Sequence, residues 1–289
     1  MADGEWSRGD AYEAYVGRWR WSRLVAREFV PWLGVPAGRR WLDVGCGTGA
    51  LTGAVLTAAQ PVLVVGVDPS AGFLATARAR MRAGSWSGAE PAPDARPGSH
   101  TGAPLGPPTD VLFCAADARA LPLPPARFEA SVSGLALNFV PDPARAVAEL
   151  ARVATPGGVV AAYVWDYAGG MELIRHFWDA AASLDPAAAA LDEARRFPLC
   201  RPEPLAALWA GAGLTDVTVE PIDVTTDFAT FEDYWRPFLG GQGPAPGYVA
   251  SLTAEHRRAL RELLRDRLAG RLRLTARAWA VRGDVGPPE

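Results

Sequence analysis

The chain has 289 residues, of which 49% are hydrophobic, and a formal net charge of −3, which fits one large domain with elaborations. The charge argues against a general affinity for nucleic acids or anionic membranes, and no apolar run reaches the roughly 20 residues that span a bilayer. All 29 basic residues are arginines, so lysine Schiff-base chemistry and a P-loop lysine are excluded.

The first predicted element is a buried strand, Arg40–Val44, that runs into a glycine-rich turn. Gly45, Gly47 and Gly49 remove side chains where a ligand can lie against bare backbone, and they tolerate positive φ. A helix follows, so we expect the amide groups of the turn to face a ligand in the crevice. The spacing also satisfies the dinucleotide pattern G-x-G-x-x-G/A, so the turn alone predicts a nucleotide-like cofactor without choosing its class.

Strand-like and helix-like runs alternate through the middle of the chain, which predicts a doubly wound parallel sheet. Nearly continuous apolar content marks the strands, as expected when both faces are covered. The predicted strands are Arg40–Val44, Val62–Val67, Val111–Ala115, Ala130–Gly134 and Gly158–Trp165. The predicted helices between them are Leu51–Ala59, Ala71–Met81 and Pro143–Val153. Later elements are a helix over Pro204–Ala212 and strands over Leu214–Val224 and Arg271–Val281.

Three segments interrupt this alternation. Residues 83–109 are rich in Gly, Pro, Ser and Ala and lack apolar periodicity, which predicts a flexible surface insertion. Residues 166–201 and 225–270 follow strands and carry several aromatic side chains. Insertions after strand ends often build a substrate pocket over the carboxyl edge of the sheet, so we expect these two segments to be substrate caps.

Acidic residues follow the second and third predicted strands. Asp68 can accept hydrogen bonds from ribose hydroxyls, or it can cap the helix that starts after Pro69. A dinucleotide enzyme would also use such an acid. Asp117 is more discriminating, because it can accept from the exocyclic amine of adenine while the Ala118 amide donates to a ring nitrogen. Nicotinamide-binding folds have no standard need for an acid at that position.

The motifs in this order resemble those of class I S-adenosylmethionine-dependent methyltransferases, in the broad group that includes the ubiquinone and menaquinone biosynthesis methyltransferases. The matching motifs are Asp43-Val-Gly-Cys-Gly-Thr-Gly49, Val67-Asp68, Ala116-Asp117-Ala118, Leu121-Pro-x-Pro124, Phe128-Glu129 and Pro156-Gly-Gly158. The resemblance implies an α/β, Rossmann-like, seven-stranded sheet with an antiparallel last strand. It also implies helical caps over the carboxyl edge and a single methyltransferase domain over residues 1–289.

The resemblance further implies which residues bind S-adenosylmethionine. The glycine loop would hold the methionine part, and later strand ends the ribose, the adenine and the surroundings of the sulfonium. The implied residues are Asp43, Gly45, Cys46, Gly47, Gly49, Asp68, Pro69, Asp117, Ala118, Gly134 and Leu135. Residues 1–38 would form an N-terminal helical lid, in which Tyr15 faces the sulfonium and Arg18 pairs with the methionine carboxylate. An amphipathic helix packed on the sheet is the alternative for that segment.

The implied reaction is in-line transfer of a methyl group to a small-molecule acceptor, with release of S-adenosylhomocysteine. Alignment in a dry pocket is the main requirement, and a general base is optional. Asp166 and His176 are candidate bases, and neither is certain. The segment Gly-Leu-Ala-Leu-Asn-Phe after the fourth strand lacks the Asn/Asp-Pro-Pro-Tyr/Phe signature of adenine, cytosine and glutamine amino methyltransferases. The aromatic caps favour a small, partly apolar acceptor.

Two other functions remain open on the sequence. One is a non-catalytic protein that binds the cofactor and regulates or scaffolds a partner. The other is an NAD-dependent oxidoreductase, which Asp43 and the pair of Asp117 with Ala118 oppose. Three widely spaced cysteines suggest no disulfide framework and no metal site, and we interpret Cys46 as a buried filler rather than a nucleophile. The first residues lack a signal peptide, so we expect a cytoplasmic protein; the oligomeric state is unknown.

Overall fold

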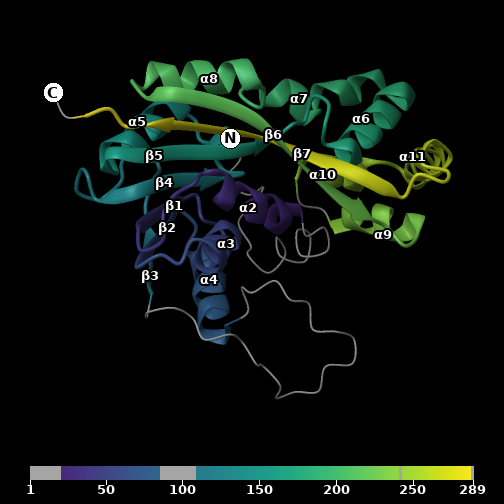
Figure 1. Ribbon diagram of the computed structural model, residues 1–289. Coiled ribbons are helices and arrows are strands. Elements are labelled where there is room, and N and C mark those ends of the chain that lie inside the picture. The colour runs from purple at the N-terminus through teal and green to yellow at the C-terminus, as the bar shows by residue number, and fades with distance from the viewer. Residues whose placement is uncertain (1–20, 85–108, 241–242, 288–289) are drawn as a thin grey trace.

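A seven-stranded sheet forms the centre of the molecule in a computed structural model, which describes residues 21–84, 109–240 and 243–287 (Figure 1). The strands are β1 Arg40–Val44, β2 Leu63–Asp68, β3 Asp110–Ala115, β4 Phe128–Gly134, β5 Ala154–Trp165, β6 Thr215–Asp227 and β7 Arg273–Asp284. Their order is β3-β2-β1-β4-β5-β7-β6. Strands β1 to β5 are parallel, and β7 runs antiparallel to both β5 and β6. The predicted fold class is therefore confirmed.

The central strands are buried because their side chains are apolar on both faces. Four of the five residues of β1 are buried, and so are five of the six residues of β2. The edge strand β3 differs, with Leu112 58% exposed. A strand that is covered on both faces leaves its ends as the places where polar side chains can meet a ligand.

Helices cover both faces of the sheet (Figure 1). On one side lie α2 Trp21–Trp32, α3 Ala50–Ala58 and α4 Ala71–Ala83. On the other side lie α5 Pro143–Val153 and α8 Pro202–Gly211. This two-sided arrangement follows from the right-handed crossovers that connect parallel strands on either side of β1.

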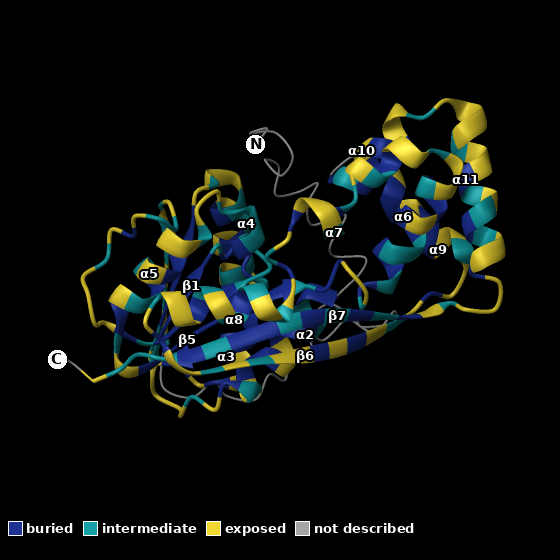
Figure 2. Ribbon diagram, turned by 90° about the horizontal axis from the view of Figure 1, so that it is seen from above, coloured by how far each residue is buried: buried dark blue, intermediate teal, exposed yellow. Residues whose placement is uncertain are grey.

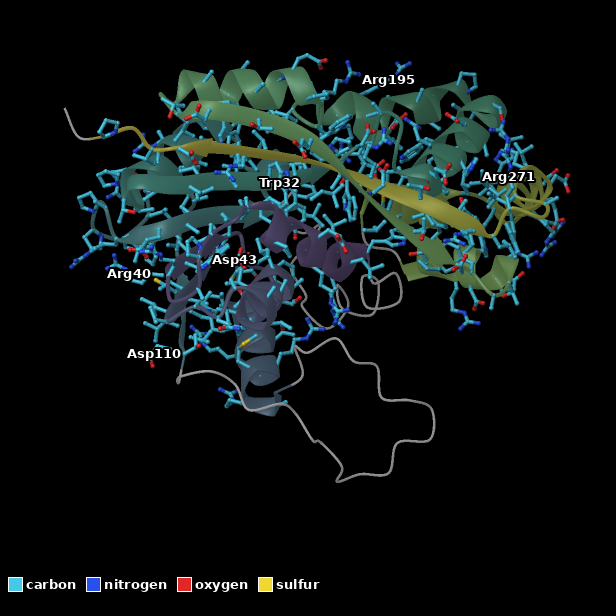
Figure 3. The ribbon with its side chains drawn as sticks, in the orientation of Figure 1. Trp32, Arg40, Asp43, Asp110, Arg195 and Arg271 are labelled. Carbon is cyan, nitrogen blue, oxygen red and sulfur yellow. The ribbon has the colours of Figure 1, made fainter. Side chains whose placement is uncertain are left out.

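Helix α2 packs against α3 and against β6. The indole N–H of Trp21 donates to Thr226 Oγ1. That of Trp32, which is labelled in Figure 3, donates to Glu220 Oε2 at 2.9 Å. The described part of the predicted N-terminal lid is thus a helix fixed to the last strands of the sheet. Tyr15 and Arg18 lie outside the described residues, so their predicted contacts with the cofactor stay predictions.

The remaining helices gather beyond the ends of β6 and β7 and form a cap (Figure 2). They are α6 Glu172–Leu184, α7 Glu193–Arg196, α9 Phe231–Trp235, α10 Pro244–Ser251 and α11 Ala254–Arg267. The short 3₁₀ helices η2 Pro186–Ala190 and η3 Arg236–Gly240 pack with them, whereas η1 Leu137–Phe139 follows β4. Aromatic side chains from the two insertions meet inside this cap. Phe177 stacks on Phe238 with ring centroids 4.5 Å apart, and the Tyr234 hydroxyl donates to the Leu173 carbonyl at 3.2 Å.

The outer surface of the cap carries ion pairs. On α11, Leu260 and Leu264 are buried while Arg261 and Arg265 pair with Glu232 on α9. This is the pattern of an amphipathic helix with a solvated charged face. Among the described residues, no helix combines the length and the apolar character needed to cross a bilayer.

Candidate functional site

A cavity of about 640 Å³ lies at the carboxyl edge of the sheet. Its walls include residues at or just after the carboxyl ends of β1 to β5, together with residues of α2, α6, α7 and α10. The strand order reverses between β1 and β4, and the crevice at such a switch point is the usual ligand site of an open α/β sheet. The chemistry of the cavity therefore depends on what these strand ends present.

Asp43 near the end of β1 presents a buried carboxyl group to the cavity (Figure 3). Its Oδ2 accepts from the Thr52 hydroxyl at 2.7 Å, whereas its Oδ1 is buried and has no hydrogen-bond partner among the described residues. Burial raises the pKa of this carboxyl to about 7. An unpartnered acceptor in this position calls for a donor from a ligand, and a cationic donor would also stabilise the charged form.

The glycine turn uses its own amide groups within the protein. The amides of Gly45 and Cys46 both donate to the Val67 carbonyl, at 2.7 and 3.0 Å. The Gly47 amide donates to Asp68 Oδ2 at 3.0 Å, and the Gly49 amide donates to the Cys46 carbonyl at 2.9 Å. The expectation that the amides of the turn face the ligand is therefore wrong for these four groups. The first three hold the turn against the end of β2 and the Gly49 amide closes the turn itself, so these groups do not form a phosphate cradle.

Asp68 at the end of β2 joins two segments that flank the cavity. Its carboxylate accepts from the Gly47 amide and, at 2.8 Å, from the Ser70 amide. Helix α4 is capped by the Ser70 hydroxyl, which accepts from the Phe73 amide. Asp68 is thus not the capping side chain itself, and each of its oxygens keeps a lone pair for a further donor. Burial raises the pKa of this carboxyl, because the charged form is desolvated.

Asp117 follows β3 and is paired with Arg119. The guanidinium donates to both carboxylate oxygens, with Nη2 to Oδ2 at 2.6 Å. The Arg119 side chain is the main reason that the pKa of Asp117 falls to about 2. The carboxylate is half exposed and lines the cavity, so it is charged and able to accept from a ligand amine while it stays paired.

The turn after β4 brings the backbone close to the sheet. Leu135 has a positive φ of 56° and its amide donates to the Tyr163 carbonyl at 2.8 Å. A Cβ atom at Gly134 would lie 2.6 Å from the Tyr163 hydroxyl oxygen, so the glycine makes room for that side chain. Left-handed backbone at a residue other than glycine costs about 1–3 kcal/mol and is concentrated at functional sites.

Most of the sequence-predicted cofactor residues meet in this one cavity. Those that line it are Asp43, Gly45, Cys46, Gly47, Asp68, Pro69, Asp117, Ala118, Gly134 and Leu135. Gly49 does not line it, because it lies behind the turn at the start of α3. The thiol of Cys46 is buried, and burial raises its pKa well above the usual range, which fits a filler rather than a nucleophile.

Neither candidate base lines the cavity. The Asp166 carboxylate accepts from the Gly169 and Gly170 amides at 3.1 and 2.8 Å, and so closes the loop after β5. His176 lies half-buried on α6, where burial lowers its pKa. Their role as bases was predicted from sequence position alone and stays a prediction, because among the described wall residues of the cavity neither side chain is found.

The part of the cavity wall that the cap provides was not predicted from the sequence. The wall in that part is made of Tyr167, Met171, Ile174, Glu193, Phe197 and Pro244, next to Phe139 after β4 and Trp165 at the end of β5. Glu193 is the acidic side chain of this set, and it is 5% exposed. The only sequence signal was the density of aromatic residues in the two insertions, which predicts a pocket but does not say which side chains enter it.

Comparison with known proteins supports a methyltransferase architecture. Residues 42–162 match the family model of a methyltransferase domain. A demethylmenaquinone methyltransferase of Renibacterium salmoninarum is 34% identical over 144 residues, which cover 48% of this chain and 45% of that protein. The chain thus matches less than half the length of this relative. The resemblance that the sequence motifs indicated is confirmed over the region in which they lie.

Solved structures show the same fold over most of the chain. The YcgJ protein of Bacillus subtilis has a TM-score of 0.54 at 16% identity, covering 91% of this chain and 99% of that one. The phosphoethanolamine N-methyltransferase 2 of Haemonchus contortus, solved with S-adenosyl-L-methionine, has a TM-score of 0.52 at 17% identity. That match covers 97% of this chain and 57% of the other. At these identities the likeness concerns the fold alone.

Proposed function

We propose that this chain, whose residues 42–162 match a methyltransferase domain, binds S-adenosyl-L-methionine and methylates a small molecule. The observation that carries the proposal is the set of hydrogen-bond acceptors in the cavity wall. Asp43, Asp68 and Asp117 line it, while four amides of the glycine turn are already used inside the protein. A ligand that offers an ammonium group, ribose hydroxyls and an adenine amine matches such a wall.

The same set of hydrogen-bond acceptors argues against a dinucleotide cofactor. A pyrophosphate needs free amide donors at the glycine turn, and the nearby carboxylates would repel it. Here the Gly47 amide donates to Asp68, and among the described residues that line the cavity the buried side-chain atom without a partner is an acceptor, Asp43 Oδ1. An NAD-dependent oxidoreductase is therefore the weaker proposal.

Each acidic side chain would hold one part of the cofactor. Asp43 would accept from the ammonium group of the methionine part, Asp68 from the ribose hydroxyls, and Asp117 from the adenine amine. When bound, S-adenosylmethionine supplies an electrophilic methyl group on a positively charged sulfur. Gly134 and Leu135 would bring the wall close to this group, because they form the tight turn after β4 that lines the cavity.

The task of the protein in this reaction is to align the acceptor and exclude water. The cap supplies apolar and aromatic wall residues opposite the cofactor-binding strand ends. We propose that residues 166–201 and 225–270 act as the substrate cap and that residues 1–38 help to close the cavity, within a single methyltransferase domain. We further propose that the protein acts in the cytoplasm, as expected from its sequence.

A transfer assay tests this function. The protein is incubated with methyl-labelled S-adenosylmethionine and a fractionated extract of small metabolites, and both labelled products and S-adenosylhomocysteine are measured. We expect one product class to gain label in step with S-adenosylhomocysteine release. Asp43→Asn should lose transfer, while Asp110→Asn, an exposed residue at the start of edge strand β3, should keep it.

The outcomes separate the proposed functions. Cofactor binding without label transfer to any fraction would favour a non-catalytic protein that binds the cofactor. Transfer that Asp43→Asn leaves unchanged would contradict the assignment of the methionine site, though not the activity.

A further inference from the structure

Glu193, at the start of α7, places a buried carboxyl group in the wall of the cavity. The indole N–H of Trp178 on α6 donates to its Oε2. In the described part of the chain, no arginine or histidine forms an ion pair with this carboxyl. A buried acid of this kind is costly to ionise unless a ligand supplies the missing positive charge.

Aromatic rings surround the same part of the cavity. Phe197 lies one helical turn after Glu193, and its amide donates to the Glu193 carbonyl at 2.9 Å. Its ring is 5.1 Å from that of Phe139, edge to face, and 5.8 Å from that of Tyr167. All three rings line the cavity. The Arg196 guanidinium lies 5.6 Å from the centroid of the Phe197 ring, so this cluster already attracts one cation. Such faces attract a cation and accommodate an apolar body, so they suit a positively charged ligand beside the Glu193 carboxyl group.

An ion pair holds α7 in place. Arg175 on α6 bridges to Asp192 with Nη2 and Oδ2 2.7 Å apart, and its Nη1 donates to the Tyr167 carbonyl at 3.2 Å. Asp192 also caps α7 by accepting from the Ala194 amide at 2.9 Å. Glu193 is therefore fixed from both sides, by this clamp and by Trp178, which is the preorganisation that a reacting group needs.

Burial and the neighbouring charges place the pKa of the Glu193 carboxyl close to neutral pH. Burial is the main reason that the pKa of its carboxyl rises to about 7. Asp192 raises this pKa further, while Arg196 and the hydrogen bond from Trp178 lower it. Arg175 faces Asp192 and is paired with it. A carboxyl with a pKa near the working pH can both bind a cation and take up a proton.

We propose that Glu193 binds the methyl acceptor as a general base, and that this acceptor is an amine on an apolar or aromatic body. The inference rests on the proposed methyltransferase function, and it names the acceptor class for that same cavity. The carboxylate pairs with the acceptor in its ammonium form. An amine fits better than a hydroxyl, because a neutral hydroxyl would leave the buried charge uncompensated.

The step balances without a further reagent. Glu193 takes one proton from the ammonium nitrogen, which frees its lone pair. That lone pair forms the new C–N bond as the C–S bond breaks, and the electron pair of the broken bond stays on sulfur. The product leaves as a methylated ammonium ion, and the proton on Glu193 passes to solvent.

Binding experiments test this independently of turnover. Phenethylamine and tryptamine, with their matching neutral alcohols and with phenols, are titrated into the protein saturated with S-adenosylhomocysteine. We expect amines to bind at least about tenfold more tightly to the native protein than to Glu193→Gln, since a buried charge pair is worth more than 1.4 kcal/mol. The alcohols should bind both proteins alike. Glu203→Gln, exposed on α8, is the matched control and should behave as the native protein.

The pH dependence of amine methylation gives a second measurement. At saturating cofactor, kcat/KM should rise as the pH increases through about 7, because the carboxylate is the active form. Glu193→Gln should lose that rise. Equal amine affinity in the native protein and Glu193→Gln, or methylation of phenols but not amines, would overturn the inference. Failure of the native protein to bind the cofactor would instead overturn the proposed function, and the inference with it.

Discussion

Asp43 and Asp68 serve the cavity in different ways, although both are acids at the ends of neighbouring strands. Asp68 is tied to the amides of Gly47 and Ser70 and so shapes the wall. Asp43 keeps one buried oxygen to which no group in the described part of the chain donates, and it is therefore the side chain whose protonation state depends most on the ligand. Both positions were predictable from sequence, because an acid directly at the end of an apolar strand marks this edge of the sheet.

Asp43 should make cofactor binding depend on pH. Its pKa of about 7 in the free protein means that it is largely protonated below that pH, whereas a bound ammonium group favours the charged form. Affinity for S-adenosylmethionine should therefore rise as pH increases from 5.5 to 7, by up to about tenfold per unit, and then level off. Calorimetry over this range would measure it. Asp43→Asn should bind weakly with a flat profile, and a flat profile in the native protein would contradict the assignment.

Gly45 should tolerate no side chain. A Cβ atom there would lie 2.4 Å from the Cβ of Ala136, and its φ is 74°. Gly38 has a φ of 76° with nothing within 4 Å, so Gly38→Ala isolates the conformational cost of about 1–2 kcal/mol. Gly45→Ala should lower the free energy of unfolding by about 1–3 kcal/mol more, because it overpacks the site. Urea unfolding compares the two, and equal losses would show that the turn can open at Gly45.

The position of Glu193 in the cavity wall could not be predicted from the pattern of residues in the sequence. The helix that carries it has four residues, too few for an apolar period, and its partner Trp178 belongs to another helix. The charge and the aromatic ring meet only in the folded chain. The pairing of Arg119 with Asp117 is local and could have been anticipated, since only Ala118 lies between them.

At the scale of elements, the apolar runs predicted the central strands well because both faces of those strands are buried. β1 and α5 have the predicted bounds. β5 begins at Ala154, four residues before the predicted start at Gly158, because Ala154 pairs with Phe128 across a register shift. The Pro-Gly-Gly sequence suggested a turn outside the strand, and such a bulge is invisible to periodicity.

The clamp between α6 and α7 should control the acceptor and not the cofactor. Asp192→Asn removes the charge that Arg175 pairs with and weakens the cap of α7. We expect a KM for the acceptor several-fold higher and an unchanged affinity for S-adenosylmethionine. Asp179→Asn is the matched control, because that carboxylate is exposed and lies 3.8 Å from Arg175. Steady-state kinetics with each substrate varied in turn would separate the effect on the KM of the acceptor from any effect on cofactor affinity. A loss of cofactor affinity in Asp192→Asn would count against a separate acceptor site.

At the scale of the whole molecule, the two insertions form one cap. Residues of α6 and η3 stack their rings, so segments about 60 residues apart in sequence share a core. The sequence indicated that each insertion was aromatic, but nothing in either one specified that they pack together. The result is a cavity with acidic strand ends on one side and an aromatic wall with one buried acid on the other.

The central claim is that the strand ends bind S-adenosylmethionine and not a dinucleotide. Isothermal titration of the native protein with S-adenosylmethionine, S-adenosylhomocysteine and NAD tests it most directly. We predict saturable one-to-one binding of the first two, weakened by about 1–3 kcal/mol in Asp68→Ala because a charge-assisted contact is lost, and no measurable binding of NAD. Tight binding of NAD without a response to S-adenosylmethionine would contradict the account.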